Sequence, residues 1–350
     1  MPHTSKPVGA FLSPKLVGLL AALVTVLIWT SFIVIARASA DPARGGLLNP
    51  FDIVYARIWG ASLVLLPWGW WINQRDRLRR DEGSPAFTIA ARDAAGGSLL
   101  GVSPLPLRTT IKVGLFGGVL YAVLAYNGFV FAPAAHASVL MPGSLPLWTA
   151  LLAVPFLGER ITPARAAGLV LIVGGDLLVG GASLLNALDG SGIWRGDVLF
   201  IASAVVWSTY SVLVRRLSLD AVRATIAITA FAFVVFVPAY SVLLLAHAVP
   251  GRVFTAPFHD VAFQMFFQGV GSVVISGISF TKMIQHFGPV RSTMITALVP
   301  GLSAMAAAIF LGEPLSWNLL AGLALVTLGI LFGVRQVAAT RAAAPDAARA

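Results

Sequence analysis

Three ionisable side chains lie inside or at the edge of long apolar stretches of this sequence, namely Arg57, His136 and Asp176. A charged side chain at the centre of a bilayer costs roughly 2.5 kcal/mol or more, so each residue is a candidate coupling or gating group. Burial favours the protonated form of a carboxyl group, so Asp176 is a candidate for proton coupling. The alternative is that Asp176, in the outer half of its helix, reaches interfacial water.

The other two residues have a functional and a structural interpretation each. His136 titrates near neutral pH and is a candidate gate, but a histidine at a helix start is also a common capping or hydrogen-bonded residue. Arg57 is either a clamp for a substrate carboxylate or a structural residue. In the second case it extends to the interface or pairs with the nearby Asp52.

Two tryptophans fall near the middle of apolar segments, although tryptophan is usually enriched at the membrane interface. Trp29 and Trp207 each belong to a stripe of partly polar residues on one helical face. These stripes are interpreted either as facing walls of a central cavity or as core packing. The stripes are Thr25, Trp29 and Phe32, and Ser203, Trp207 and Tyr210.

Pro146 and Pro300 interrupt two apolar segments at equivalent depth. A proline lacks the backbone N–H and frees the carbonyl four residues earlier, which at membrane depth requires protein or a water-filled cavity to satisfy it. We expect these interruptions to line a substrate path, with a packing kink as the alternative. The candidate substrate-binding residues are Trp29, Thr30, Tyr126, Ser138, Met141, Pro146, Trp207, Tyr210, Gln268, Ser292, Thr296 and Pro300.

The elements that position these residues are membrane-spanning helices. Of 350 residues, 58% are apolar and 11% charged, and the mean hydropathy is +0.87, which excludes a soluble domain. Cysteine is absent, so disulfides and thiolate metal sites are excluded. We predict ten spans, at 16–38, 51–72, 110–131, 133–156, 163–183, 195–215, 221–247, 259–284, 288–311 and 316–336.

The charge distribution predicts the orientation. With the N-terminus in the cytoplasm, 19 of the 24 Lys and Arg residues fall on cytoplasmic segments and four outside. This bias agrees with the positive-inside rule and predicts that both termini are cytoplasmic. The net charge of +10 follows from these loops and needs no nucleic acid partner. We expect a multi-pass protein of the bacterial inner membrane.

The sequence also contains an internal duplication. Residues 156–159, Phe-Leu-Gly-Glu, recur at 310–313, and the first spans of each half match at an offset of 178 residues instead of 154. The difference predicts an insertion at 73–109, expected to be a mobile cytoplasmic loop. Five spans in each half invert the second copy, which is the signature of secondary transporters with midplane sites.

The duplication predicts the domain organisation and several structural roles. Glu159 and Glu313 are expected to order helix ends on opposite faces, with a gate as the alternative. Small-residue stripes on the fifth and tenth spans indicate close helix packing or a dimer contact. The predicted segments are a tail at 1–15, a first repeat at 16–183, a second repeat at 195–336 and a disordered tail at 337–350.

These motifs resemble the EamA-type, ten-helix members of the drug/metabolite transporter superfamily over residues 16–336. The resemblance rests on the doubled Leu-Gly-Glu segments, Gly-Asp-Val-Leu at 196–199, Trp207 and Arg215-Arg216. It implies an all-α protein with two inverted five-helix repeats that exports small metabolites. The long 73–109 loop and Asp176 depart from the pattern.

The expected activity is alternating-access transport of a small neutral or zwitterionic organic solute, such as an amino acid. The expected partners are that solute and the lipid bilayer, with no cofactor or metal, and the protein is a monomer or homodimer. The alternatives are a membrane-embedded sensor that uses the 73–109 loop and a lipid-modifying enzyme. The enzyme would require clustered His, Asp or Glu, but the five His residues are scattered.

Overall fold

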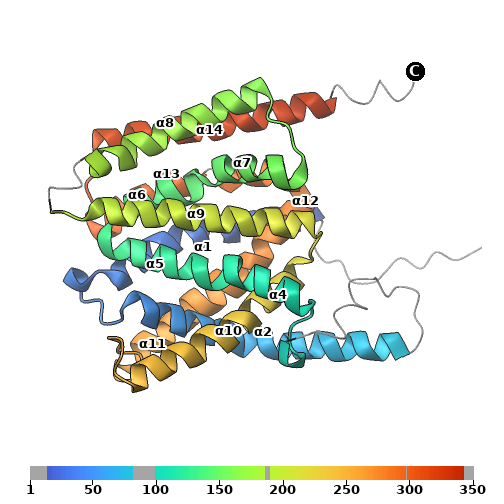
Figure 1. Cartoon of the computed structure of the whole chain (residues 1–350). Helices are drawn as coiled ribbons and strands as arrows, with labels where there is room; N and C mark the ends of the chain where they lie inside the picture. Colours follow the sequence, from blue (N-terminus) through green and yellow to red (C-terminus); the bar gives the residue numbers. More distant parts are fainter. Residues whose placement is uncertain (1–13, 82–98, 186–189, 297, 343–350) are drawn as a thin grey trace, which may run out of the picture.

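All regular secondary structure that the computed structural model describes is helical (Figure 1). The structure describes residues 14–81, 99–185, 190–296 and 298–342. The long helices are α1 (Pro14–Ala40), α2 (Pro50–Asp81), α8 (Pro163–Leu185), α9 (Ile193–Arg216), α10 (Ala221–Leu245), α12 (Ser276–Thr296) and α14 (Trp317–Ala342). The shorter ones are α4 (Leu107–Gly114), α5 (Tyr121–Phe131), α6 (Ala134–Ser138), α7 (Leu145–Leu157), α11 (Phe258–Gln264) and α13 (Leu298–Leu311).

Within these residues, seven helical stretches are long and apolar enough to cross a membrane. They correspond to α1, α4–α5, α6–α7, α8, α9, α10 and the stretch Phe258–Phe280. Two shorter apolar stretches lie in α13 and α14, and α2 is a further helix of 32 residues. The predicted all-α, polytopic architecture is therefore confirmed.

The two halves of the chain pack against each other rather than forming separate bundles. The first helix of each half contacts the third helix of the other half, since α1 packs on α12 and α9 packs on α5. In the same way α8 packs on α14, and α2 on the segment Met265–Ile275. This reciprocal packing places the centre of the molecule at the interface between the repeats.

The glycine stripes explain the closest of these contacts. A Cβ atom added at Gly175 would lie 2.6 Å from the carbonyl oxygen of Gly322, and one at Gly329 would lie 2.5 Å from that of Gly168. The absence of side chains lets the backbones of α8 and α14 touch. The predicted packing role is confirmed.

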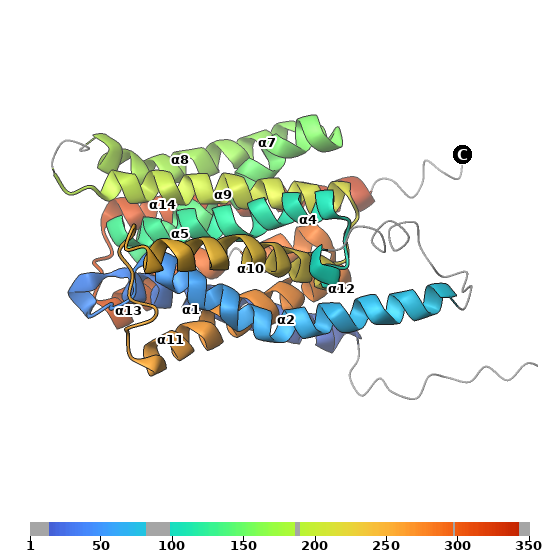
Figure 2. The ribbon, with the colours of Figure 1, turned by 60° about the horizontal axis from the view of Figure 1, so that its bottom comes forward.

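Two predicted non-helical segments are partly wrong. Helix α2 continues to Asp81 and extends beyond its neighbours in Figure 2, so residues 73–81 of the predicted loop are helical. Arg223 holds this extension through an ion pair of 2.6 Å to Asp76, and the Asn73 amide donates to Gly101 O at 2.8 Å. Helix α14 likewise includes residues 337–342 of the predicted disordered tail. Residues 82–98 and 343–350 lie outside the described part of the chain.

The predicted spans also leave a non-helical connection at 285–287, between the eighth and ninth spans. This prediction is wrong, because α12 runs through these residues. Ile295 nevertheless packs in one cluster with Ala21, Ala22 and Met283. Residues on both sides of this segment therefore pack in the cluster that α1 and α12 form.

Both repeats widen or break a helix at equivalent positions. Leu115–Leu120 in the first half and Met265–Ile275 in the second form π-helix, which often occurs at functional sites. A third π segment, Val139–Gly143, contains Pro142 and separates α6 from α7. In the second half the equivalent region includes residue 297, which lies outside the described part of the chain.

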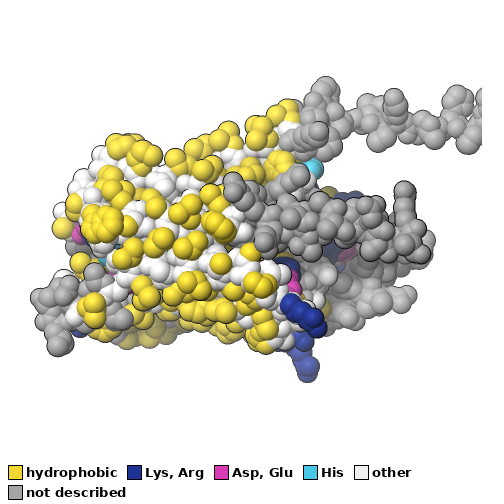
Figure 3. Space-filling model, turned by 90° about the horizontal axis from the view of Figure 1, so that it is seen from above, with side chains coloured by type: hydrophobic (Ala, Val, Ile, Leu, Met, Phe, Trp, Pro, Cys, Tyr) yellow, Lys and Arg dark blue, Asp and Glu magenta, His cyan; other side chains and the backbone are white. Residues whose placement is uncertain are grey.

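The outer surface and the ends of the bundle differ in composition. In Figure 3 hydrophobic side chains cover the face formed by α8 and α14, and the Lys and Arg side chains in view gather at one end. Helices α9 and α14 both end on that side, to the right in Figure 1. An apolar belt with a basic end is the surface of a helix bundle that spans a bilayer.

Candidate functional site

A polar cluster, partly buried at Arg57 and Ser272 and fully buried at its other two residues, joins three helical segments from both halves of the chain. Arg57 Nη1 on α2 donates to Tyr126 Oη at 3.3 Å and to Ser272 Oγ at 3.2 Å. Tyr126, on α5, donates in turn to Gln268 Oε1 at 2.8 Å. Tyr126 and Gln268 are both fully buried. We call Arg57, Tyr126, Gln268 and Ser272 the arginine cluster.

Two glycines bring the helices of this cluster together. A Cβ atom at Gly60 of α2 would collide with the backbone of Met265, and one at Gly269 would lie 2.8 Å from Arg57 O. The backbones of α2 and the π segment Met265–Ile275 are therefore in contact one turn from Arg57. This close approach lets the guanidinium reach both Ser272 and the Tyr126–Gln268 pair.

Trp29 extends the arginine cluster toward α1 and α12. Its indole Nε1 donates to Ser276 Oγ at 3.3 Å, and its ring lies 5.0 Å from that of Phe280. Ser276 Oγ donates to Ser272 O at 2.7 Å. The indole is thus connected through two serines to Arg57. Thr30, the next residue along α1, has a buried hydroxyl without a hydrogen-bond partner.

The second predicted aromatic stripe occupies the pseudo-symmetric position. The Trp207 ring on α9 lies 4.7 Å from that of Tyr121 and 5.1 Å from that of Tyr210. Tyr210 in turn packs on Gly117, where an added Cβ atom would lie 2.7 Å from its ring. Each tryptophan therefore contacts the third helix of the opposite repeat.

The predicted pairing of Arg57 with Asp52 is wrong. Asp52 accepts from Tyr240 Oη at 2.9 Å and from the backbone N–H groups of Arg252 and Val253 at 2.9 and 3.1 Å. These hydrogen bonds use both oxygens of the Asp52 carboxylate, which lies in the first turn of α2. Among the described residues, no carboxylate forms an ion pair with Arg57.

The helix interruption in the first half lies two to three residues earlier than predicted. Pro146 sits in the first turn of α7, where a missing N–H costs nothing. Pro300 lies in α13, and residue 297, which precedes that helix, is outside the described part of the chain. Ser144 Oγ donates to Leu140 O at 2.6 Å and so satisfies a carbonyl at the break. A Cβ atom at Gly143 would lie 3.9 Å from Pro300 Cγ, so the break before α7 lies beside Pro300 of α13.

Other candidates surround these breaks. Ser138 is fully buried and donates to Ala135 O at 2.7 Å, and Met141 is buried beside it. Thr296 ends α12 and has an interaction partner. Ser292 lies in α12, where the structure describes the backbone alone.

His136 and Asp176 are separate from the arginine cluster. His136 Nδ1 lies 2.9 Å from the Asp197 carboxylate, which joins the start of α6 to the start of α9. Asp197, in the Gly-Asp-Val-Leu segment at 196–199, was not among the predicted site residues. Asp176 lies on α8, which packs mainly on α14, and its Oδ1 is buried without a hydrogen-bond partner.

The two duplicated glutamates form equivalent ion pairs at opposite ends of the bundle. At one end Glu313 accepts from Arg37 Nε at 3.4 Å and from the N–H groups of Ala134 and Ala135, both at 3.1 Å. At the other end Glu159 accepts from Arg215 at 2.5 Å and Arg165 at 3.1 Å. We call Arg37–Glu313 and Arg215–Glu159 the end pairs.

The end pairs obey the internal symmetry of the chain. Arg37 and Arg215 are related by the 178-residue offset, and Glu159 and Glu313 by the 154-residue offset. Each pair therefore joins the first helix of one repeat to the end of the fourth helix of the other. The pairs differ in exposure, since the Glu313 side chain is 7% exposed and the Glu159 side chain 28%.

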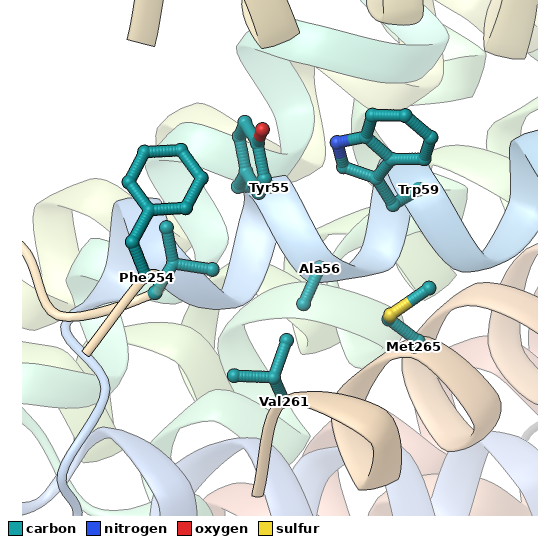
Figure 4. Close-up of a pocket in the computed structure, with 7 residues that line it drawn as sticks. Tyr55, Ala56, Trp59, Phe254, Val261 and Met265 are labelled. Atoms are coloured by element: carbon teal, nitrogen blue, oxygen red, sulfur yellow. The ribbon is translucent and has the colours of Figure 1, made fainter. Parts of the chain in front are cut away.

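An apolar pocket lies on a different face of α2 (Figure 4). It has a volume of about 270 Å³ and lies between α2, the 253–254 segment and the start of the eighth span. It contains none of the predicted site residues. Its lining residues are Tyr55, Ala56, Trp59, Val253, Phe254, Val261 and Met265.

Comparison with known proteins is consistent with this architecture. The chain is 25% identical to the uncharacterized transporter YyaM of Bacillus subtilis, over 63% of this chain and 69% of that protein. It is 26% identical to an uncharacterized transporter of Archaeoglobus fulgidus, over 66% of this chain and 78% of the relative. A solved crystal structure with 21% identity shares the fold at a TM-score of 0.54, covering 91% of this chain and 97% of the other.

The family assignment covers both repeats. Residues 16–181 and 194–335 each match the model of the EamA-like transporter family. The two matched segments coincide with the two inverted repeats and leave out only the termini and the connection between α8 and α9. The chain therefore belongs to the EamA-like transporter family.

Proposed function

We propose that the protein is a secondary transporter that moves a small neutral or zwitterionic organic solute by alternating access between the two repeats. The observation that carries this proposal is the pair of symmetry-related end pairs. Each one ties the two repeats together at one end of the bundle. In alternating access, each end pair holds one end closed and must break when that end opens.

The bonding at the two ends supports this assignment. At the Glu313 end Arg37 also donates to Phe129 O at 2.6 Å, so one contact network joins α1, α5, α6 and α13. At the Glu159 end Arg215 is 45% exposed and its carboxylate partner has no backbone donor within the described residues. These contacts support a conformation that is held closed more firmly at the Glu313 end.

The intervening helices supply a route for a solute of modest charge. The arginine cluster, the two tryptophans and the helix break beside Pro300 all lie where the repeats meet. Few charged side chains face this interface, which suits a neutral or zwitterionic solute such as an amino acid. Export from the bacterial cytoplasm follows from the family resemblance, and Asp176 is the candidate for proton coupling.

Cross-linking tests whether the end pairs act as gates. Because the chain has no cysteine, a single pair of cysteines can be introduced without background. The variants R37C/E313C and R215C/E159C are placed in proteoliposomes and treated with a short, cleavable thiol cross-linker. Uptake and efflux across a metabolite panel are then measured, with and without a pH gradient.

Either cross-link is expected to stop transport, and cleavage of the linker is expected to restore it. The matched control is E159C/R165C, which shares one cysteine but joins only the ends of the α7–α8 connection and should transport when cross-linked. Continued transport with either end pair locked would contradict alternating access at these ends. Failure of the unmodified protein to move any solute would contradict the transporter function itself.

A further inference from the structure

The arginine cluster holds more hydrogen-bond donors than acceptors. A guanidinium carries five N–H donors and no acceptor. Among the described residues, Arg57 donates through Nη1 alone, to Tyr126 and Ser272. The amide Nε2 of Gln268 is fully buried and has no hydrogen-bond partner. Arg57 and Gln268 therefore both bond the Tyr126 hydroxyl, and both keep N–H donors that no acceptor among the described residues uses.

The direction of the hydrogen bonds fixes which end of Gln268 is free. Arg57 can only donate, so Tyr126 Oη accepts from it and must place its own hydrogen elsewhere. That hydrogen goes to Gln268 Oε1 at 2.8 Å. With the amide reversed, Gln268 Oε1 and the tyrosine hydrogen would both lose their partners. The free group is therefore the Nε2 donor.

The charge of the cluster is also uncompensated. No ion pair to Arg57 occurs among the residues described, and the nearest acidic residue along α2, Asp52, is bound to Tyr240 and the 252–253 backbone. Aromatic faces partly stabilise the cation, since Arg57 Cζ lies 5.9 Å from the Phe32 ring centroid and 6.0 Å from that of Tyr126. A partly buried cation without a carboxylate partner, beside a buried donor without an acceptor, would be stabilised by an anion that joins them.

We propose that the arginine cluster binds the carboxylate of the transported solute, with Arg57 and Gln268 Nε2 as its donors. A carboxylate has two acceptor oxygens and matches the fork of a guanidinium. The cluster supplies no carboxylate to receive an ammonium group. Carboxylic acids and amino acids are therefore ligands, and amines that lack the carboxylate are not. This proposal rests on the proposed transport function in one respect: it takes the bound carboxylate to be part of the transported solute.

The aromatic groups beside the cluster suggest the probes. Phe32 borders Arg57, and the Trp29–Phe280 pair is joined to it through Ser276 and Ser272. A suitable set is phenylalanine, 3-phenylpropionate, phenethylamine and phenylalanine amide, with leucine, isovalerate and isoamylamine as an aliphatic set. Binding is measured as thermal stabilisation of the purified full-length protein, which does not require transport.

The acids and amino acids are expected to raise the melting temperature, while the amines and the amide have no effect. R57Q is expected to weaken acid binding at least about 30-fold, the loss typical of removing one partner of a buried charged contact. R57K, which keeps the charge without the fork, tests the geometry if R57Q fails to fold.

Gln268→Glu supplies an internal carboxylate for Arg57 and is expected to abolish acid binding while the protein remains folded. The matched control is Gln264→Glu, one helical turn earlier, where the amide bonds Ser39 and not the cluster. Equal stabilisation by amine and acid, acid binding that survives R57Q and Q268E, or no acid-dependent stabilisation by either set would overturn the proposal. The cross-linking assay is independent of these outcomes, so the two proposals can fail separately.

Discussion

At the scale of single residues, the same glutamate has two different environments in the two repeats. Glu313 is buried and holds the first backbone N–H groups of α6, whereas Glu159 is more exposed and meets two arginines. Burial alone would raise the pKa of Glu159, but hydrogen bonding to Arg165 and the charge of Arg215 outweigh it and lower the pKa. The predicted capping role is confirmed for Glu313, and the gating role stays a proposal.

A pH titration tests the Glu159 pair. Because the folded-state pKa lies below that of the unfolded chain, the pair stabilises the fold fully above the ordinary Glu pKa of about 4.3. This contribution disappears as the pH falls through the lower folded-state value. E159Q is expected to lower stability at pH 7 by about 0.2–1 kcal/mol, the range of exposed ion pairs. The difference from the native protein, measured by thermal unfolding across a pH series, should shrink and vanish as the pH falls through the lowered folded-state pKa; a difference that stays constant down to the acid limit of the fold would refute the assignment.

At the scale of elements, the helices are predicted well where composition alone decides them and poorly where the chain leaves the apolar region. The extension of α2 to Asp81 follows from its polar but helix-compatible residues and from contacts with Arg223 and Gly101. Such contacts come from distant parts of the chain. The displacement of the helix break from Pro146 has a local cause, since proline is tolerated in the first turn of a helix.

The α8–α14 contact provides a test at this scale. Gly175→Ala would place a methyl group 2.6 Å from the carbonyl oxygen of Gly322, so the helices must separate. A loss of about 1–3 kcal/mol is expected, as for other overpacked cores. The neighbouring Gly174→Ala is the control, because its methyl group would meet only Leu325 at 3.7 Å. Comparable melting temperatures for the two variants would contradict the described packing.

At the scale of the whole molecule, the two repeats complete each other. Neither the arginine cluster nor either end pair lies within one repeat, because α2 packs on the π segment Met265–Ile275 and α1 on α12 and α13. A transport pathway between such halves requires opposite orientations of the two copies. The orientation itself is predicted from the basic residues.

Reporter fusions test that orientation. A reporter active only in the cytoplasm should be active at the C-terminus, and one active only in the periplasm should be active when inserted at residues 190–192. The reason is the excess of Lys and Arg at the end where α14 finishes. If a C-terminal fusion were active in the periplasm, a chain with a cytoplasmic N-terminus could not have an even number of spans. The ten-span prediction would then be wrong. An insertion in the α7–α8 connection serves as the cytoplasmic control.

The sequence by itself determined the membrane class, the duplication and the family, because hydropathy and repeat spacing are properties of the chain that do not depend on contacts. It also identified Arg57, Tyr126 and Gln268 as separate candidates. Only the tertiary structure joined these residues through Ser272, redirected Asp52 to Tyr240 and paired Arg37 with Glu313. These pairings depend on which helix faces lie together, and those faces are selected by close glycine contacts between segments some 200 residues apart along the chain.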